Sequence, residues 1–326
     1  MKKEVSSMIR TTECSSGAAG RKRWSRALAL VVVWALGVHA GVAWAAGPPA
    51  PPAAPASANA DKVVPPRTAG GRELVTVSDG RQLAPEIARI FNRGELVVAM
   101  LGVDTPPFFY KKSNGELAGL EVDLAKSIAR ELKVAVRFDR SAQSFNDVVD
   151  VVARGDADLG VSKLSRTLAR AQKISFTQPY LRLNHAFILN RVKFAEYAKG
   201  RSVPSAIRDF RGTLGVIANS SFADYAGRYF PLAELRAYPT WGDLLRAVSK
   251  GEVIAAYRDE FEVKSVLKID PTASLTLRTV TFKDLEDTLG IAVSIQDPVL
   301  LAFVDQYLSQ SAEKLTIDKV LQALDH

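Results

Sequence analysis

The sequence predicts an α/β protein made of two similar halves. Apolar segments of strand length alternate with segments in which apolar residues recur every three or four positions, and this rhythm occurs twice along the chain. Strands that alternate with helices are typical of α/β units with a largely parallel sheet. With 326 residues, of which 47% are hydrophobic, the chain is long enough for two compact domains.

The first half begins with a predicted helix over residues 83–94, which Gly94 ends. A continuous apolar run at 95–103 then predicts a strand that is buried on both faces. An amphipathic helix follows, because apolar residues recur every four positions at Leu120, Leu124, Ile128 and Leu132. The half is completed by a strand at 134–138, a helix from Phe145 to about Gly155, and a strand at 157–161.

The second half repeats this alternation. Strands are predicted at 213–218, 253–257 and 289–295, and helices at 221–229, 241–251 and 259–268. Two further helices are expected from Asp297 onward.

Residues 1–45 have the pattern of a secretory signal peptide. A basic cluster at 21–26 precedes an apolar run at 27–43, and Ala43 and Ala45 then occupy the −3 and −1 positions of a signal-peptidase site. An uncleaved anchor is the alternative, although the apolar run is at the short limit for crossing a bilayer. Residues 46–70 are rich in proline and alanine and predict an extended linker.

Charge, cysteine and histidine content exclude several classes of function. Seven basic and two acidic residues lie in the first 45 positions, so they supply five of the formal net charge of +8, and the remainder is no nucleic-acid footprint. The single cysteine, Cys14, lies before the apolar run, so the exported chain has no thiol chemistry. The histidines His39, His185 and His326 are isolated, and we expect no metal site and no cofactor.

Six motifs occur in an order and spacing typical of one family. They are RGELVVAM, NGELAGLEVDLAKSIARELKV, GDADLGVSKLSRTLARAQKISFTQPY, LGVIANSSFADY, GEVIAAYRDE and LGIAVSIQDPVLLAFVDQYL. From about Glu86 to the C-terminus, the chain therefore resembles the family 3 extracellular solute-binding proteins. These are periplasmic amino-acid receptors of ABC importers.

The resemblance implies a bilobal, periplasmic binding protein-like type II fold, with two α/β lobes joined by a two-strand hinge. Residues 86–190 plus 289–326 would form lobe 1, and residues 191–288 would form lobe 2. A small solute such as an amino acid would bind in the cleft and draw the lobes together. The implied partner is an inner-membrane ABC permease, and we expect a periplasmic monomer that binds no nucleic acid.

Arg170 is the candidate partner of a ligand carboxylate. The family signature has an arginine six residues before a phenylalanine, and Phe176 gives that place to Arg170. A guanidinium suits the role because its planar fork matches two carboxylate oxygens, although a surface arginine is the alternative. By resemblance Ser165 and Thr167 line the same pocket, or they act as helix caps. We expect Arg166 and Lys163 to be solvated, with a side chain that faces the cleft as the alternative for Lys163.

In lobe 2, Ser220 and Ser221 follow a strand and begin a helix, whose free N–H groups suit a carboxylate. Simple capping of that helix is the alternative. By resemblance Asp259 is the partner of an α-ammonium group, and it could also cap the next helix.

Three more residues are candidates for reading the ligand's side chain. By resemblance these are Asp104, Phe108 and Phe145, although both phenylalanines could be ordinary core and Asp104 could shape a turn. Two other functions remain open. One is a dehydratase of the same fold that acts on a prephenate-like substrate with Asp259 as general acid, and the other is a ligand sensor.

Overall fold

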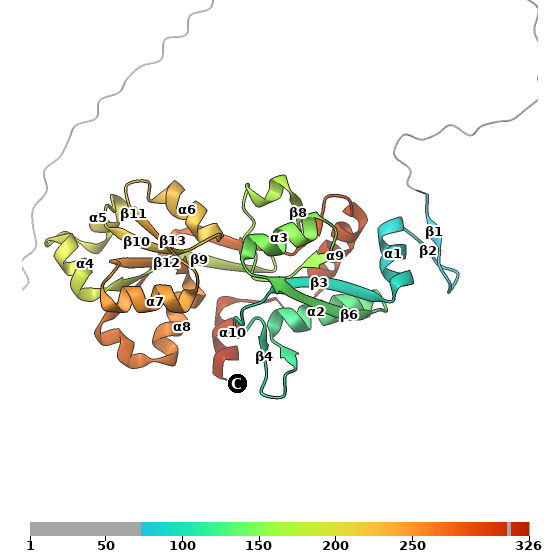
Figure 1. Cartoon of the computed structure of the whole chain (residues 1–326), viewed down its shortest axis with the longest axis horizontal. Helices are drawn as coiled ribbons and strands as arrows, with labels where there is room; N and C mark the ends of the chain where they lie inside the picture. Colours follow the sequence, from blue (N-terminus) through green and yellow to red (C-terminus); the bar gives the residue numbers. More distant parts are fainter. Residues whose placement is uncertain (1–72, 312–313, 326) are drawn as a thin grey trace, which may run out of the picture. The chain divides into compact units, whose positions relative to one another are not determined.

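A computed structural model describes residues 73–311 and 314–325. The predicted signal peptide and the whole of the predicted linker lie outside these residues. Two five-stranded sheets dominate the described chain, each flanked by helices (Figure 1). No helix within the described residues is long and apolar enough to span a membrane.

The first sheet has the strand order β6-β3-β7-β14-β8. Its central strand β3 runs parallel to both β6 and β7, whereas β14 is antiparallel to β7 and to β8. The elements of this part are α1 (Pro85–Arg93), β3 (Glu95–Leu101), α2 (Leu120–Glu131), β6 (Ala135–Ala142), α3 (Phe145–Ala153), β7 (Leu159–Gly160), η1 (Arg170–Gln172), β8 (Ile174–Phe176), β14 (Ala292–Ser294), α9 (Pro298–Gln310), α10 (Ile317–Gln322) and η3 (Ala323–Asp325). Two short hairpins, β1 (Val75–Thr76) with β2 (Gln82–Leu83) and β4 (Tyr110–Lys111) with β5 (Leu117–Ala118), complete it.

The second sheet has the order β11-β10-β12-β9-β13. Strand β10 is parallel to β11 and β12, and β9 is antiparallel to β12 and β13. Its elements are β9 (Leu181–Asn190), α4 (Arg191–Ala198), α5 (Val203–Arg208), β10 (Thr213–Ile217), α6 (Ser221–Tyr229), β11 (Glu234–Tyr238), α7 (Trp241–Lys250), β12 (Ala255–Asp259), α8 (Glu260–Ile269), η2 (Pro271–Leu275) and β13 (Leu277–Leu289).

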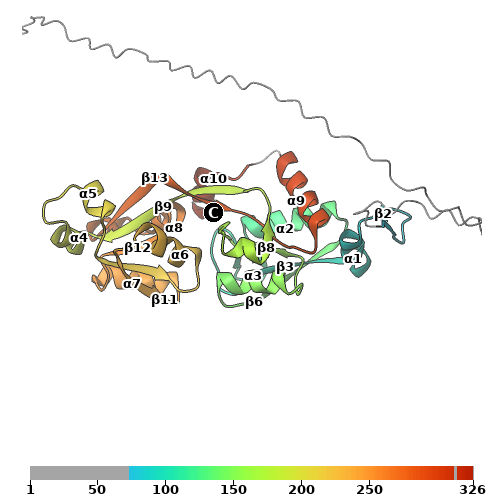
Figure 2. The same ribbon diagram turned by 90° about the horizontal axis from the view of Figure 1, so that it is seen from above.

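Strands β9 and β13 connect the two hydrophobic cores. They pair along their full length, with a register shift between Phe282 and Glu286, and Figure 2 shows them passing from one sheet toward the other. Leu181 and Leu289, which face each other at one end, pack in the core of the first sheet. Leu189, near the other end of β9, packs in the core of the second.

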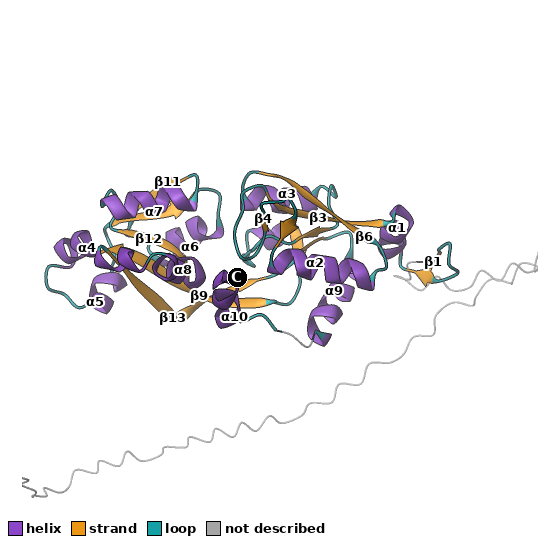
Figure 3. Cartoon of the chain, turned by 90° about the horizontal axis from the view of Figure 1, so that it is seen from below, coloured by secondary structure: helices purple, strands orange, loops and turns teal. Residues whose placement is uncertain are grey.

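The second sheet is covered on both faces because side chains of a strand alternate in direction. Phe187 and Leu189 of β9 pack with residues of α4, α5 and α6. Ala186 and Ile188, one residue out of step, pack with residues of α7 and α8. Figure 3 shows these helices around the strands of the sheet.

Most predicted elements are present, and the differences have a physical cause. The helices predicted at 221–229 and from Phe145 are α6 and α3. Strand β13 was not predicted, because its mixed polar and apolar sequence follows neither period and its pairing with β9 is non-local. The strand predicted at 289–295 is shorter, and both sheets are mixed and not largely parallel.

Candidate functional site

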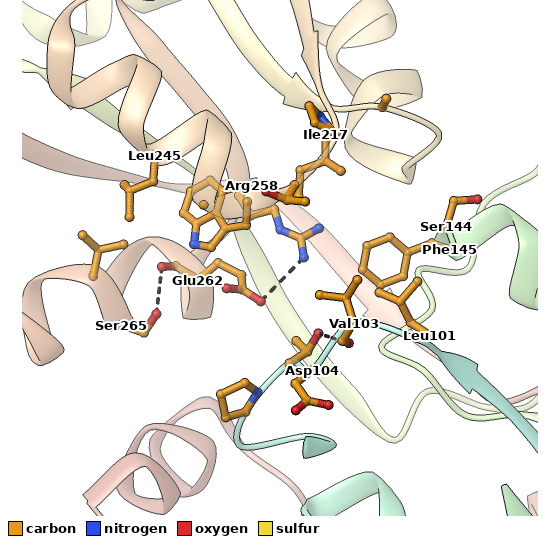
Figure 4. Close-up of a pocket in the computed structure, with 18 of the residues that line it drawn as sticks. Leu101, Val103, Asp104, Ser144, Phe145, Ile217, Leu245, Arg258, Glu262 and Ser265 are labelled. Atoms are coloured by element: carbon orange, nitrogen blue, oxygen red, sulfur yellow. Dashed lines mark hydrogen bonds and ion pairs between the residues drawn. The ribbon is translucent and has the colours of Figure 1, made fainter. Parts of the chain in front are cut away.

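A pocket of about 920 Å³ lies between loops of the first sheet and elements of the second. Its walls come from the end of β3, the start of α3, the loop after β10, α7 and α8. Figure 4 shows Leu101, Val103 and Phe145 facing Ile217, Leu245 and Arg258. Next to it, a much smaller space of about 10 Å³ is shared by Phe145 and Arg258 with Arg170 and Asp259. That volume is close to what one water molecule needs.

Arg170 begins the short turn η1 and is buried at 5% relative exposure. Its Nε and Nη2 donate to Oδ1 of Asn146 at 3.1 and 3.0 Å, and its Nη1 donates to the backbone oxygen of Ser165 at 3.1 Å. A guanidinium has five N–H donors, so one hydrogen on each Nη is left over. Both remaining hydrogens can donate to a further acceptor such as a carboxylate.

Ser165 lies at the space of about 10 Å³ and makes hydrogen bonds to residues next to the second sheet and within it. Its Oγ donates to Oδ2 of Asp287 at 2.8 Å and lies 2.8 Å from Oγ of Ser221. Since Ser165 has one hydroxyl hydrogen, Ser221 is the donor in the serine pair. Thr167 is a local cap, because its Oγ1 accepts the backbone N–H of Arg170 at 3.2 Å.

The start of α6 brings Ser220 and Ser221 to the same place. Ser220 is the N-cap, and its Oγ donates to the backbone oxygen of Ile217 at 2.6 Å and accepts from the N–H of Ala223 at 3.4 Å. Asn219 before it has a left-handed backbone (φ 52°), which asparagine tolerates. The capping role is therefore observed for Ser220, and Ser221 makes the contact across the cleft.

Asp259 caps the next helix, which is one of the two roles that the sequence suggested, and its cationic partner in the structure is a residue of this chain. Its Oδ1 caps α8 by accepting the N–H of Glu262 at 3.2 Å. Its Oδ2 lies 3.0 Å from Nζ of Lys163, and Glu262 Oε1 lies 2.6 Å from the same nitrogen. Lys163 is therefore buried in the cleft, and the expectation that it is solvated was wrong, whereas Arg166 is exposed.

Arg258 separates the two pockets and was not predicted to take part. Its guanidinium lies over the rings of Phe145 and Phe222, 5.4 and 5.7 Å from their centroids. Its Nη2 is 3.6 Å from Glu262 Oε1, as Figure 4 shows, and its buried Nε has no hydrogen-bond partner. A buried donor without an acceptor is costly, so this N–H can still donate to an anionic or carbonyl group.

Phe145 and Asp104 line the large pocket, and Phe108 lines neither pocket. Asp104 Oδ1 accepts from Nη1 of Arg140 at 2.8 Å, and its other oxygen accepts the N–H of Lys111 at 3.2 Å, which stabilises the turn. Phe108 is fully buried, and its ring packs edge-on against Phe261 at 5.2 Å.

Burial shifts the pKa values of three carboxyl groups. Burial raises the pKa of Asp287 to about 6, against the lowering effect of the Ser165 hydrogen bond. Burial also raises the pKa of Glu121 to about 7, although Tyr180 and the N–H of Lys163 donate to this group. For Asp259, burial alone would raise the pKa, but Lys163 and Arg258 outweigh it and the pKa is lowered. Asp259 is therefore ionised at neutral pH.

Sequence reasoning missed four contributors: Asn146, Arg258, Glu262 and Asp287. Arg258 and Glu262 had a sequence signal, because each lies within three residues of Asp259. Asn146 had a similar signal, because it follows the candidate Phe145, whereas Asp287 had none, since it reaches Ser165 from 122 positions away.

Two mixed α/β sheets, a paired strand crossing and a cleft with a buried arginine define a bilobal binding protein of the type II class. The model of the bacterial extracellular solute-binding proteins, family 3, matches residues 96–323. The chain belongs to this family.

Known relatives agree with this assignment. The amino-acid-binding protein AabA of Dichelobacter nodosus is 34% identical over 223 residues, which cover 65% of this chain and 81% of the relative. The ABC transporter arginine-binding protein 1 of Escherichia coli (strain K12) is 23% identical over 217 residues, covering 66% and 84%. In structure, the chain is similar to the substrate-binding protein AbpA of Streptococcus pneumoniae bound to L-arginine. The TM-score is 0.57 at 26% identity, with coverage of 73% and 97%.

Proposed function

We propose that this protein is a periplasmic receptor that captures a small solute through a carboxylate group and delivers it to an ABC importer. The observation that carries the proposal is the pair of free guanidinium hydrogens of Arg170 beside the Ser165–Ser221 contact. A carboxylate that reaches this point would bind Arg170 of lobe 1 and lie beside Ser221 of lobe 2. The solute would thus favour the arrangement in which the lobes are together.

The hinge of this receptor would be the pair β9 and β13. They are the strands that enter both cores, so a change in their twist would move one core relative to the other. In this proposal the boundaries remain those expected from the sequence, with residues 191–288 as lobe 2. Residues 1–45 would be removed during export, and the receptor would act as a monomer.

Amino acids and acids derived from them are the first solutes to test. Relatives are named for arginine and amino-acid binding, and one related structure holds L-arginine. The pocket of about 920 Å³ has room for a solute body of that size.

Binding is favoured over the dehydratase alternative by the state of Asp259. A general acid must carry a proton at working pH. Lys163 and Arg258 lower the pKa of Asp259, which opposes that role.

A thermal-shift screen of the purified protein tests the proposal. The panel consists of the twenty amino acids, their counterparts without the α-amino group, and prephenate. We expect at least one carboxylate to raise the melting temperature and to reduce the radius of gyration in X-ray scattering. No shift with any carboxylate, or turnover of prephenate, would contradict the receptor function.

A further inference from the structure

Lys163 occupies a complete ammonium-binding site within the cleft. Its Nζ lies 3.0 Å from Asp259 Oδ2 and 2.6 Å from Glu262 Oε1. The rings of Phe108 and Phe261 lie beside the same nitrogen, with centroids at 4.9 and 5.0 Å. Two carboxylates and two aromatic rings are the surroundings that a bound ammonium group requires.

The backbone of Lys163 is fixed so that its side chain enters this site. Its N–H donates to both carboxyl oxygens of Glu121, at 2.8 and 3.0 Å. Its φ of 50° lies in the left-handed region, which is uncommon for residues other than glycine. The side chain is only 2% exposed. Lys163 is therefore held at both ends, by Glu121 at its backbone and by Asp259 and Glu262 at its ammonium group.

The other carboxylates that line the two pockets, Asp104, Asp147, Asp270 and Asp287, already accept hydrogen bonds from the protein. Asp104 is paired with Arg140, and Asp147 accepts N–H groups at the start of α3. Asp287 accepts from Ser165 at 2.8 Å on one oxygen and from Tyr225 at 3.4 Å on the other. The cations differ, because Arg170 keeps two free N–H groups, and the Nε of Arg258 has no hydrogen-bond acceptor, although it lies 3.9 Å from Asp259 Oδ2.

From this imbalance we infer that the solute is a carboxylate without an α-ammonium group, because Lys163 supplies the ammonium from the protein itself. The inference rests on the proposed function and narrows its solute class. An amino acid would have to displace Lys163 from two carboxylates, and a buried ion left without its partner is strongly unfavourable. An acid of the same shape without the amine meets only the free donors of Arg170 and Arg258.

Matched pairs of solutes test the inference on the wild-type protein by calorimetric titration. The pairs are L-phenylalanine with 3-phenylpropanoate, L-leucine with 4-methylpentanoate, L-glutamate with glutarate, and L-arginine with 5-guanidinopentanoate. For each pair that binds, we expect the acid without the amine to bind at least tenfold more tightly.

The variant Lys163→Met adds a second measurement, because it keeps the length of the side chain and removes the ammonium. In this variant we expect the ratio of the two affinities within each pair to change by at least tenfold in favour of the amino acid. Lys173→Met is the control, since Lys173 is exposed and pairs with Asp150 on the surface. It should leave the preference unchanged.

The outcomes separate the two proposals. Wild-type binding of an amino acid as tight as that of its deaminated partner would overturn the inference and leave the receptor function standing. An unchanged preference in folded Lys163→Met would also overturn it. Failure of every member of every pair to bind would instead overturn the proposed function, and the inference with it.

Discussion

Arg170→Lys separates a two-pronged carboxylate contact from a simple positive charge. Arginine at this position uses three N–H groups on Asn146 and Ser165 and keeps two for a ligand. Lysine keeps the charge but has one nitrogen, so it cannot serve both the protein and two carboxylate oxygens.

The expected loss of affinity follows from the number of contacts. A charge-assisted hydrogen bond contributes about 1.5–3 kcal/mol, so the loss of one prong weakens binding roughly ten- to hundredfold. The free protein is also affected, because Asn146 and Ser165 lose at least two donors. At about 0.5–1.5 kcal/mol for each hydrogen bond, the free energy of unfolding should fall by about 1–3 kcal/mol.

The assay is calorimetric titration with the tightest solute of the matched pairs, together with urea unfolding without solute. Arg166→Lys is the control, because Arg166 is four residues away and exposed. It should bind almost as the wild type does. Binding by Arg170→Lys within twofold of wild type, or an equal loss in Arg166→Lys, would refute the carboxylate role of Arg170.

Three further changes test the charges and the backbone around the cleft. Burial raises the pKa of Glu121 from 4.5 to about 7, so the folded protein keeps a proton that the unfolded chain releases. The contribution of Glu121 to stability should therefore fall as pH rises from about 4.5 to 7, by up to about 3 kcal/mol, and Glu121→Gln should remove this contribution in urea unfolding at pH 5 and 8. Parallel pH profiles of the wild type and Glu121→Gln would contradict this effect of burial on Glu121. Asp259→Asn leaves Lys163 with one carboxylate in place of two. We expect the free energy of unfolding to fall by about 3 kcal/mol in the same assay. A change below about 0.5 kcal/mol would mean that the ion pair is not needed for stability. Gly119→Ala should lower the melting temperature strongly, because Gly119 has a φ of 124° and a Cβ would lie 2.3 Å from a backbone oxygen. An unchanged melting temperature would be inconsistent with this packing.

The local elements followed from the sequence because their signals lie within a few residues. Ser144, with Asp147 three residues later, marks the start of α3, and the side chains of this pair form a capping box. Gly94 ends α1 in a left-handed conformation, as the helix stop required. The family motifs also placed Arg170 and Asp259 in the cleft, where the structure has them.

The sequence alone therefore determined the α/β class, the position of most helices and of about half of the strands, and the identity of two charged residues in the cleft. It could not determine which charges meet. Lys163 and Asp259 are 96 positions apart, and only the approach of the two sheets brings them within 3.0 Å. The tertiary structure alone decided that Asp259 and Glu262 pair with the buried Lys163. The physical reason is that desolvation and ion pairing depend on distances across the cleft, which no local sequence pattern specifies.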